Sequence, residues 1–457
     1  MDKSSTKNFL ERESAWLKLD NDKIFDFCED YKTFISENKI EREVADYIVS
    51  ILKKKGFNDI AHFSSLKSGD KVYKTLRGKG VIAATIGKDN SKSHILGSHI
   101  DSPRLDLKPY PLIEDSEIAF MKTHYYGGIK KYQWVNVPLA LHGVVLTKSG
   151  KKITLKIGEN DKDPIFIIPD LLPHLAKKQL EKIGSELIEG EQLNLVVGSI
   201  PVKDKKIKER IKSEVLNKLN KEYGITEEDF LVAEIEVVPS AKARDVGFDK
   251  SLIAAYGQDD KVCVFTTLMA FIEAAKPKQT TITMFFDKEE IGSVGNTGAH
   301  SFALLNFAKE ILELSNSKIS AEKFLENSNS ISADVTAAMD PNFKEVFDPN
   351  NSSFIGKGIV IEKYGGSFGK YSSNDASAEY MHFLRDILNN KKIPWQSGEA
   401  GKIDVGGGGT IALFMSRHGM NCVDAGPGLL AMHAPMEISS KVDVYSSYLF
   451  YKAFLDS

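Results

Sequence analysis

The feature that most constrains the fold of this chain is an alternation of strand-like and helical patterns that is interrupted once. Residues 81–86 and 94–98 are short apolar runs, which are typical of buried strands. After the interruption, a helical pattern at residues 262–275 precedes apolar runs at residues 281–286 and 331–335. This alternation predicts an α/β fold in which helices pack on a mixed sheet.

The interruption extends from Arg104 to Val246 and has a different character. Short apolar runs, such as residues 165–168, are followed by a charged helical stretch at residues 204–222. Glutamates alternate with lysines in that stretch, which favours a solvent-exposed helix face over a nucleic-acid surface. We therefore expect residues 104–246 to be an inserted domain between two parts of one α/β domain, residues 1–103 and 247–457.

Composition limits the partners and the location of the protein. The chain has 457 residues, enough for two or three domains, and 60 Lys and Arg against 63 Asp and Glu leave a net charge of −3. This balance does not indicate nucleic acid or a membrane as a partner. No stretch is long and apolar enough to span a bilayer, so we expect a cytoplasmic protein. Its three cysteines, Cys28, Cys263 and Cys422, lie far apart, as buried thiols do.

Five segments place histidines or carboxylates next to small residues or at the ends of apolar runs, where α/β folds expose their sites. Each segment alone is common in charged loops, but the combination indicates a functional site. They are His99-Ile100-Asp101, Gln258-Asp259-Asp260, Asp287-Lys288-Glu289-Glu290, Ala333-Asp334 and Met432-His433.

These residue types suit a pair of divalent metal ions. Two histidines and three carboxylates can hold two ions if one carboxylate bridges them, and nitrogen and oxygen ligands suit zinc, cobalt or manganese. Three ligating carboxylates leave an excess of about one positive charge, which can bind and acidify a bridging water. A base that is not a ligand must take the proton of that water, and Glu289-Glu290 can supply one ligand and one base.

Five motifs taken together carry a family resemblance. In order and spacing they resemble the aminopeptidase I and aspartyl aminopeptidase family of zinc metalloaminopeptidases, over nearly the whole chain. The motifs are Gly97–Leu105, Phe286–Ser293, Ile331–Asp334, Pro341–Phe343 and Met432–His433. The resemblance implies a mixed-sheet α/β/α zinc-exopeptidase domain, an inserted and mostly β dimerisation domain, and hydrolysis of the N-terminal bond of peptide substrates.

The resemblance also implies a ligand set for two zinc ions. His99 and Asp334 would hold one ion, Glu290 and His433 would hold the other, and Asp259 would bridge them. Cobalt and manganese are alternatives to zinc with these ligands.

Two further carboxylates take supporting roles under the same resemblance. Glu289 would be the general base. Asp101 would accept the free N–H of His99, which fixes the ring and raises its basicity. In this clan the peptide bond after the bridging aspartate is usually cis, which here is the bond from Asp259 to Asp260.

Two departures from the family concern substrate binding. His174 lies in a Pro-His-Leu-Ala segment shared with the family, but the family histidine that reaches a neighbouring subunit's active site aligns nearer Lys178. In the acidic-preferring branch, a lysine at a strand end pairs with the substrate carboxylate. Glu362 stands at that place here, which predicts neutral or basic N-terminal residues; a register shift of one residue would restore Lys363.

Two alternatives to an aminopeptidase stay open. A related dinuclear deacylase or carboxypeptidase would bind a substrate carboxylate with an arginine, and no arginine stands out beside the late motifs. A catalytically silent oligomeric scaffold is the other alternative, which retention of all the ligands disfavours. Because the family forms closed dodecamers, the resemblance implies a homo-oligomer, namely a homododecamer built from dimers.

Overall fold

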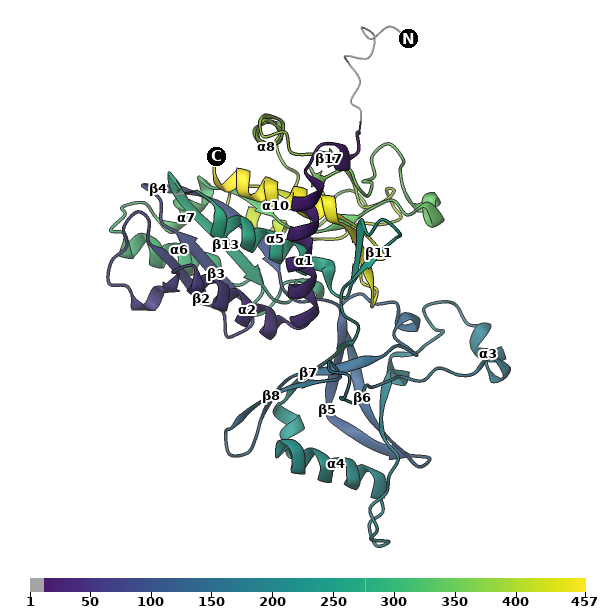
Figure 1. Cartoon of the computed structure of the whole chain (residues 1–457). Helices are drawn as coiled ribbons and strands as arrows, with labels where there is room; N and C mark the ends of the chain where they lie inside the picture. The colour runs from purple at the N-terminus through teal and green to yellow at the C-terminus, as the bar shows by residue number, and fades with distance from the viewer. Residues whose placement is uncertain (1–11, 276) are drawn as a thin grey trace.

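The computed structural model describes residues 12–275 and 277–457, and its largest element is a nine-stranded mixed sheet (Figure 1). The strand order is β1-β2-β3-β13-β4-β14-β18-β16-β17, and the adjacent strands β13, β4, β14 and β18 are parallel. The strands are β1 (Asn58–Asp59), β2 (Lys71–Thr75), β3 (Val81–Thr85), β4 (Asp89–His99), β13 (Gln279–Phe286), β14 (Asn329–Ser332), β16 (Ile359–Glu362), β17 (Trp395–Ser397) and β18 (Asn421–Gly426).

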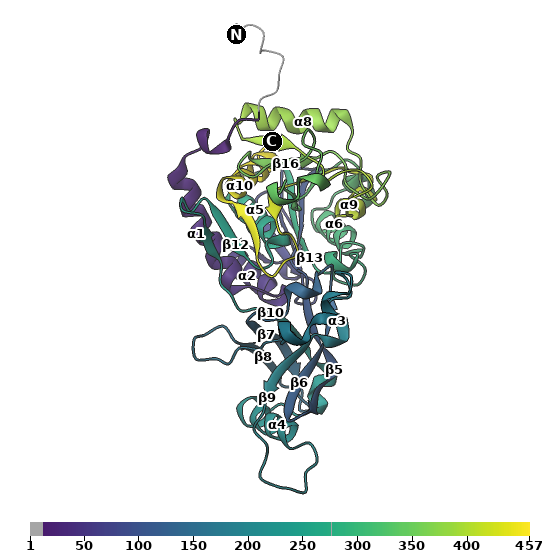
Figure 2. The same cartoon turned by 90° about the vertical axis from the view of Figure 1, so that its right-hand side faces the viewer.

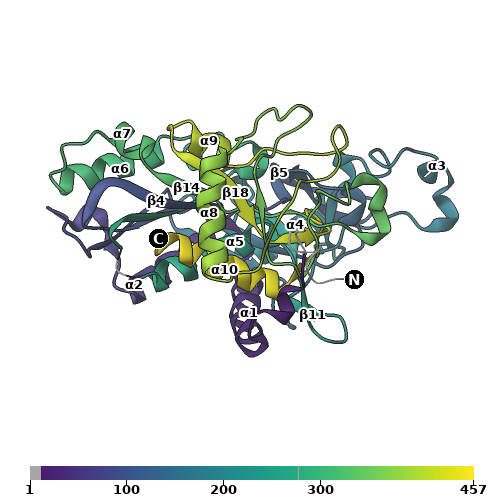
Figure 3. The ribbon, with the colours of Figure 1, turned by 90° about the horizontal axis from the view of Figure 1, so that it is seen from above.

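Helices cover both faces of this sheet, because successive side chains of its buried strands point to opposite faces. Ile95 and Met284 pack in one apolar cluster, whereas their neighbours Leu96 and Phe285 pack in the other. Figure 3 shows α6 (Ala303–Leu314) and α7 (Ala321–Glu326) on one side. The opposite side carries α1 (Asn21–Glu37), α2 (Glu41–Lys54), α5 (Gln258–Glu273) and α10 (Lys441–Leu455). The predicted mixed-sheet α/β fold is confirmed.

A smaller sheet joins the two ends of the second α/β segment. Its five strands bring the chain that follows β14 next to a segment near the C-terminus, and Thr336 pairs with Gly428. Helices α8 (Ala378–Asn390) and α9 (Ala412–Ser416) lie in the chain between them. In order, the strands are β11 (Arg244–Val246), β12 (Leu252–Ala255), β20 (Glu437–Ser440), β19 (Gly428–Leu430) and β15 (Thr336–Ala337).

We call residues 104–246 the inserted region. Apart from β11 at its end, which belongs to the five-stranded sheet, it extends below the nine-stranded sheet in Figures 1 and 2. It holds a six-stranded antiparallel sheet with its own apolar cluster, which includes Leu105, Trp134 and Val237. We propose that this region is the inserted domain expected from the sequence. Its elements are β5 (Arg104–Asp115), β6 (Ile118–Tyr126), β7 (Leu139–Leu146), β8 (Lys152–Ile157), α3 (Lys177–Leu180), β9 (Asn194–Gly198), α4 (Arg210–Tyr223) and β10 (Glu234–Pro239).

Some element boundaries differ from the sequence expectations. Helix α4 begins at Arg210 and not at residue 204. At this start, the carboxylate of Glu114 accepts hydrogen bonds from the first backbone amides of the helix. The apolar run at residues 165–168 forms only isolated bridges. Helix α5 begins at Gln258, but Asp259 and Asp260 are not helical, and the peptide bond between them is cis.

The described residues bear on two points that the composition raises. Among them, no helix combines the length and the apolar character needed to cross a membrane. All three cysteines are buried and unpaired, and burial raises the pKa of each thiol. They therefore stay protonated and inert.

Candidate metal centre

The carboxyl ends of three neighbouring parallel strands bring most of the predicted site residues together. Strands β13, β4 and β14 are adjacent, and Phe286 of β13 pairs with His99 of β4. His99 ends β4, Glu289 and Glu290 form a 3-10 turn just after β13, and Asp334 follows β14 by two residues. Such an edge is where an α/β sheet exposes its site.

Asp259 and His433 reach the same edge from outside the nine-stranded sheet. Asp259 lies at the start of α5, after Gly257, whose φ is +71° and where a Cβ would lie 2.6 Å from Lys261 Nζ. The positive φ favours glycine at this position, because side chains of L-residues are strained there. His433 lies in the loop between β19 and β20 with φ of 65°, so the five-stranded sheet determines its position.

The two oxygens of Asp259 face two different histidines. Its Oδ1 lies 3.2 Å from His99 Nε2, and its Oδ2 lies 3.1 Å from His433 Nε2. Asp334 Oδ1 lies 3.8 Å from His99 Nε2, and Glu290 Oε2 lies 3.5 Å from His433 Nε2. Asp259 therefore stands between two pairs, each made of one histidine and one carboxylate.

The electrostatics of this cluster fit bound cations. Burial, followed by a neighbouring carboxylate, raises the pKa of Glu290 and of Asp334 well above the ordinary range. Glu290 Oε1 is buried without a hydrogen-bond partner among the described residues. Buried acids without a compensating charge are costly, and a donor set of histidine nitrogens and carboxylate oxygens suits zinc. Potential ligand atoms gather within 4.8 Å in two groups that share one residue: His99, Asp259, Asp260 and Asp334, and Asp259, Glu290 and His433.

Glu289 lies beside the same groups. One potential ligand atom from each of His99, Glu289 and Glu290 falls within 4.8 Å of the others. Burial, with the charges of Asp101 and Asp259 adding to it, raises the pKa of Glu289 to about 7. A carboxyl with this pKa can both accept and donate a proton near neutral pH.

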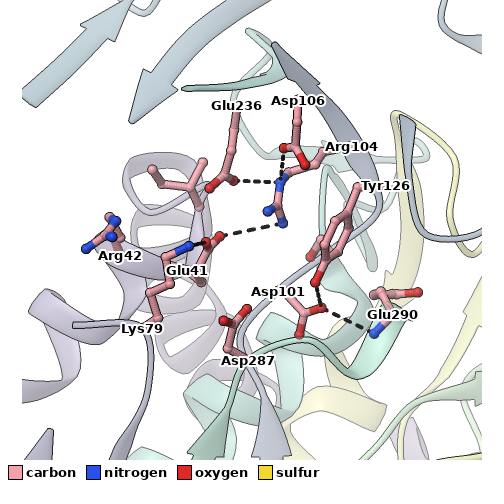
Figure 4. Close-up of polar contacts among 12 residues, drawn as sticks. Glu41, Arg42, Lys79, Asp101, Arg104, Asp106, Tyr126, Glu236, Asp287 and Glu290 are labelled. Atoms are coloured by element: carbon pink, nitrogen blue, oxygen red, sulfur yellow. Dashed lines mark hydrogen bonds and ion pairs between the residues drawn. The ribbon is translucent and has the colours of Figure 1, made fainter. Parts of the chain in front are cut away.

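Asp101 accepts hydrogen bonds from both sides of the centre, as Figure 4 shows in part. Its Oδ1 accepts from the backbone N–H of Glu289 at 3.1 Å and lies 3.4 Å from His99 Nδ1. Its Oδ2 accepts from the backbone N–H of Glu290 at 3.2 Å and from Tyr126 Oη at 2.8 Å. Asp101 thus contacts His99 on the ring nitrogen that does not face Asp259.

The sequence reasoning missed Glu437. Its Oε1 accepts from the backbone N–H of His433 at 2.7 Å, and its Oε2 accepts from that of Asp259 at 3.2 Å. One buried carboxyl therefore fixes two predicted ligands. The sequence does show a glutamate four residues after His433. Its hydrogen bonds go to backbone amides, however, and because every residue except proline has one, the sequence does not reveal its partners.

Glu362 ends β16 and lines a cavity of about 900 Å³. It is 8% exposed, and its carboxyl accepts a hydrogen bond from the hydroxyl of Thr336, two residues after Asp334. Burial raises the pKa of Glu362 to about 8. Lys363 does not line this cavity, since its Nζ lies 2.6 Å from Asp375 Oδ1. The geometry therefore places Glu362, and not Lys363, at the cavity.

His174 lies apart from the metal centre within one chain. It is exposed in a 3-10 turn, Pro173–Leu175, just before α3. Figures 1 and 3 show α3 at the outer edge of the inserted region, far from α5. A contribution of His174 to a metal centre would therefore need a second chain.

Known proteins resemble the chain in sequence and in structure. The family model described as Aminopeptidase I zinc metalloprotease (M18) matches residues 34–455. An M18 family aminopeptidase 1 from Clostridium acetobutylicum is 48% identical over 458 residues, with 98% of both chains covered. The crystal structure of an M18 family aminopeptidase from Thermotoga maritima has a TM-score of 0.95 at 45% identity and covers 98% of this chain and 100% of that chain.

A more distant structure shares the fold. The structure of the S. cerevisiae mApe1 dodecamer is 20% identical, with a TM-score of 0.76, and covers 94% of this chain and 96% of that chain. The family match spans both α/β segments and the inserted region, and it includes all of the clustered histidines and carboxylates. The chain therefore belongs to the M18 family of zinc metalloproteases and is an aminopeptidase, as its sequence motifs predict.

Proposed function

We propose that the chain hydrolyses the N-terminal peptide bond of peptides at a centre of two divalent metal ions, with zinc as the native metal. The observation that carries this proposal is the position of Asp259, whose two oxygens lie 3.2 and 3.1 Å from His99 and His433. A carboxylate shared by two ligand pairs suits two ions, whereas a single ion needs no such bridge.

The ligands divide into two sets around this bridge. His99 and Asp334 would hold one ion, and Glu290 and His433 would hold the other. The bound ions would acidify a water molecule and polarise the carbonyl of the scissile bond. Cobalt or manganese could replace zinc with the same ligands.

Glu289 moves the proton. With a pKa of about 7, its carboxylate takes a proton from the attacking water and returns it to the leaving amine. Asp101 holds its position, since it accepts the backbone N–H of Glu289 and lies against His99. Glu437 orients Asp259 and His433 through their backbone amides.

The cavity beside Glu362 selects neutral or basic N-terminal residues. An acidic side chain would bring a second carboxyl against Glu362 with no free cation to pair with it. Above about pH 8, where Glu362 is ionised, the two like charges in contact would cost several kcal/mol. Two lysines also line the cavity, but Lys370 pairs with Asp375 at 3.0 Å and Lys402 donates to the carbonyl of Glu345 at 2.6 Å. Both cations are therefore already engaged.

The alternatives fit the geometry less well. A deacylase or carboxypeptidase would need an arginine for the substrate carboxylate, and no arginine lines the Glu362 cavity among the described residues. A silent scaffold would have no use for five converging ligands and a carboxyl with a pKa near 7 beside them.

We also propose a cytoplasmic homododecamer built from dimers. Large apolar side chains are exposed around α3 of the inserted region, which favours burial against another subunit. The fold is shared with the S. cerevisiae mApe1 dodecamer. The exposed side chains are Leu171, Leu172, Leu175, Leu180 and Ile183.

One experiment tests the proposed reaction. The metal-free protein is titrated with zinc, and each loaded state is incubated with peptides that differ only in their N-terminal residue. We expect two ions per chain and stepwise release of single N-terminal residues. Binding of one ion at full activity, or cleavage from the C-terminus, would contradict the proposal.

A further inference from the structure

Three residues of the inserted region lie directly against the metal centre. Tyr126 ends β6, and its hydroxyl donates to Asp101 Oδ2 at 2.8 Å. A Cβ added at Gly127 would lie 3.3 Å from Glu290 Cβ. The carbonyl of Gly128 accepts from His433 Nδ1 at 2.8 Å, which leaves Nε2 facing Asp259. The end of β6 thus touches parts of the centre that come from three separate segments of the chain.

The bond from Tyr126 completes the surroundings of Asp101. A carboxylate accepts about four hydrogen bonds, and besides Tyr126 the backbone amides of Glu289 and Glu290 donate to the carboxylate of Asp101. His99 Nδ1 lies 3.4 Å from its Oδ1 and hydrogen-bonds to the backbone carbonyl of Asp101 at 3.2 Å. These three groups belong to the candidate metal centre itself. Tyr126 provides the shortest contact and is the donor among them that comes from the inserted region. Because the acceptor is a buried carboxylate, this bond is of the strong, charge-assisted kind.

Strand register holds the Tyr126 ring in place. Tyr126 pairs with Arg104 across β6 and β5, and the Arg104 guanidinium lies 3.9 Å from the centre of the ring. Asp106, two residues along β5, points to the same face and lies opposite Glu236 of β10. Arg104 Nε lies 2.9 Å from Asp106 Oδ1 and 3.0 Å from Glu236 Oε2 (Figure 4).

The same arginine is also held from the α/β side. Glu41, at the start of α2, lies 3.6 Å from Arg104 Nη1 and 3.1 Å from Lys79 Nζ. Arg104, Glu41 and Glu236 are all buried. We refer to Glu41, Lys79, Arg104, Asp106 and Glu236 as the Arg104 cluster. This cluster fixes the Tyr126 ring relative to both regions of the molecule.

We propose that Tyr126 is a positioning residue of the metal centre, which acts through Asp101 on His99 and on the backbone of Glu289 and Glu290. The inserted region would then complete the centre of its own chain, in addition to any role in assembly. This inference rests on the proposed two-metal function. Loss of such an outer hydrogen-bond partner typically weakens metal affinity or activity by about 10–100-fold.

The test replaces the hydroxyl alone, in Tyr126→Phe, which keeps the ring beneath Arg104. We expect a loss of about 10–100-fold in zinc affinity or in kcat, measured by zinc titration of the metal-free protein and by peptide hydrolysis with KM unchanged. The unfolding midpoint of the metal-free protein and its oligomeric mass should match those of the wild type. Tyr125→Phe is the matched control, because Tyr125 is the preceding residue, is 44% exposed and should leave every readout unchanged.

Two results would overturn the inference. One is wild-type zinc affinity and kcat in Tyr126→Phe. The other is a lower unfolding midpoint of the metal-free variant without any change in zinc affinity or kcat, which would mean that Tyr126 only stabilises the fold. If the wild-type chain itself bound fewer than two zinc ions, the proposed function would fail instead, so the two failures are distinguishable.

Discussion

The candidate metal centre and the Arg104 cluster are both largely buried groups of charges, linked through Asp101 and Tyr126, yet they are balanced differently (Figure 4). In the Arg104 cluster, Arg104 and Lys79 of the chain itself stand among three carboxylates. In the candidate metal centre, the carboxylates form ion pairs with histidines. Among the described residues, no lysine or arginine pairs with Asp259, Glu290 or Asp334.

The pKa values reflect this difference. Burial raises the pKa of an acid in both places, but Arg104 and Lys79 hold the pKa of Glu41 well below its ordinary range. Among the described residues no lysine or arginine forms an ion pair with Asp334, and burial raises its pKa well above the ordinary range although the charge of His99 opposes this rise. Glu236 also keeps a raised pKa, because burial and the negative charge of Glu41 both act on it. The Arg104 cluster is thus largely balanced by a lysine and an arginine of the chain, whereas the raised pKa values of Glu290 and Asp334 favour cations from outside the chain at the candidate metal centre.

Substitution of Asp259 is expected to have the largest effect on the candidate metal centre. We expect Asp259→Ala to lose both metal ions after dialysis, because the bridge is shared, and to lose more activity than the ~10²–10⁴-fold that removal of a proton carrier costs. His433→Ala should lower the occupancy of one ion only. Bound metal per chain, measured by elemental analysis, checks both. Equal metal retention in the two variants would show that the ligand set is wrong.

Glu289→Gln separates the base from the ligands. We expect both ions to stay bound and the folded state to persist, while kcat falls by about 10²–10⁴-fold, because the amide cannot carry the proton. Steady-state kinetics beside metal analysis of the same sample measure this. Metal loss together with full residual activity would be incompatible with the role of Glu289 as the base.

Arg104→Met tests the balanced cluster. The substitution removes the positive charge that pairs with Glu41, Asp106 and Glu236. We therefore expect the free energy of unfolding of the metal-free protein to fall by ~3–5 kcal/mol. Arg42→Met is the control, because Arg42 pairs with Glu234 at a more exposed position, where an ion pair contributes about 0–1 kcal/mol. Urea denaturation measures both. Equal effects would mean that the Arg104 cluster is no more sensitive than a surface pair.

Glu362→Lys tests whether Glu362 determines which N-terminal residues the cavity accepts. In the wild type we expect kcat/KM to be higher for leucyl and lysyl substrates than for aspartyl substrates. In the variant we expect the ratio of aspartyl to lysyl rates to rise by at least about tenfold, which corresponds to about 1.4 kcal/mol of transition-state binding. A wild-type enzyme that already prefers aspartyl substrates would show that Glu362 is not the selector.

The smallest expected effect is a pH dependence of selectivity. The pKa of Glu362 is raised to about 8, so its carboxyl is protonated below that pH and becomes ionised above it. The ionised form attracts a lysyl side chain, and the ratio of lysyl to leucyl kcat/KM should therefore rise between about pH 7 and pH 9. Glu362→Gln should flatten this rise. A ratio that falls with pH in the wild type would have the wrong sign.

Much of the candidate site could be predicted because it follows from strand ends. His99 ends one parallel strand, and Glu290 and Asp334 come soon after two neighbouring ones. Parallel strands carry their carboxyl ends to the same edge of a sheet. The apolar runs that mark those strands are visible in the sequence. The fold class and the region of the site could therefore be predicted from local sequence patterns and from the rule that parallel strands end at one edge of the sheet.

The remaining contacts depend on register and on backbone groups. Glu437 binds backbone amides, and Gly128 contributes a carbonyl, which every residue type has. Tyr126 reaches Asp101 from a different sheet. Glu362 and Lys363 are neighbours in the chain, and a shift of one residue along a strand moves a side chain to the opposite face of the sheet. Local sequence patterns do not specify these relations.

The end of β6 has a consequence for protein engineering. A chain shortened by excision of residues 104–246 would still carry His99, Asp259, Glu290, Asp334 and His433, and so would look like a minimal enzyme. It would lack the Tyr126 donor to Asp101 and the Gly128 acceptor for His433. If these contacts act as proposed, the inserted region is not a detachable module. Exchange of this region between relatives should then succeed only where the graft carries a tyrosine, a glycine in the place of Gly127 and a free backbone carbonyl in the place of Gly128.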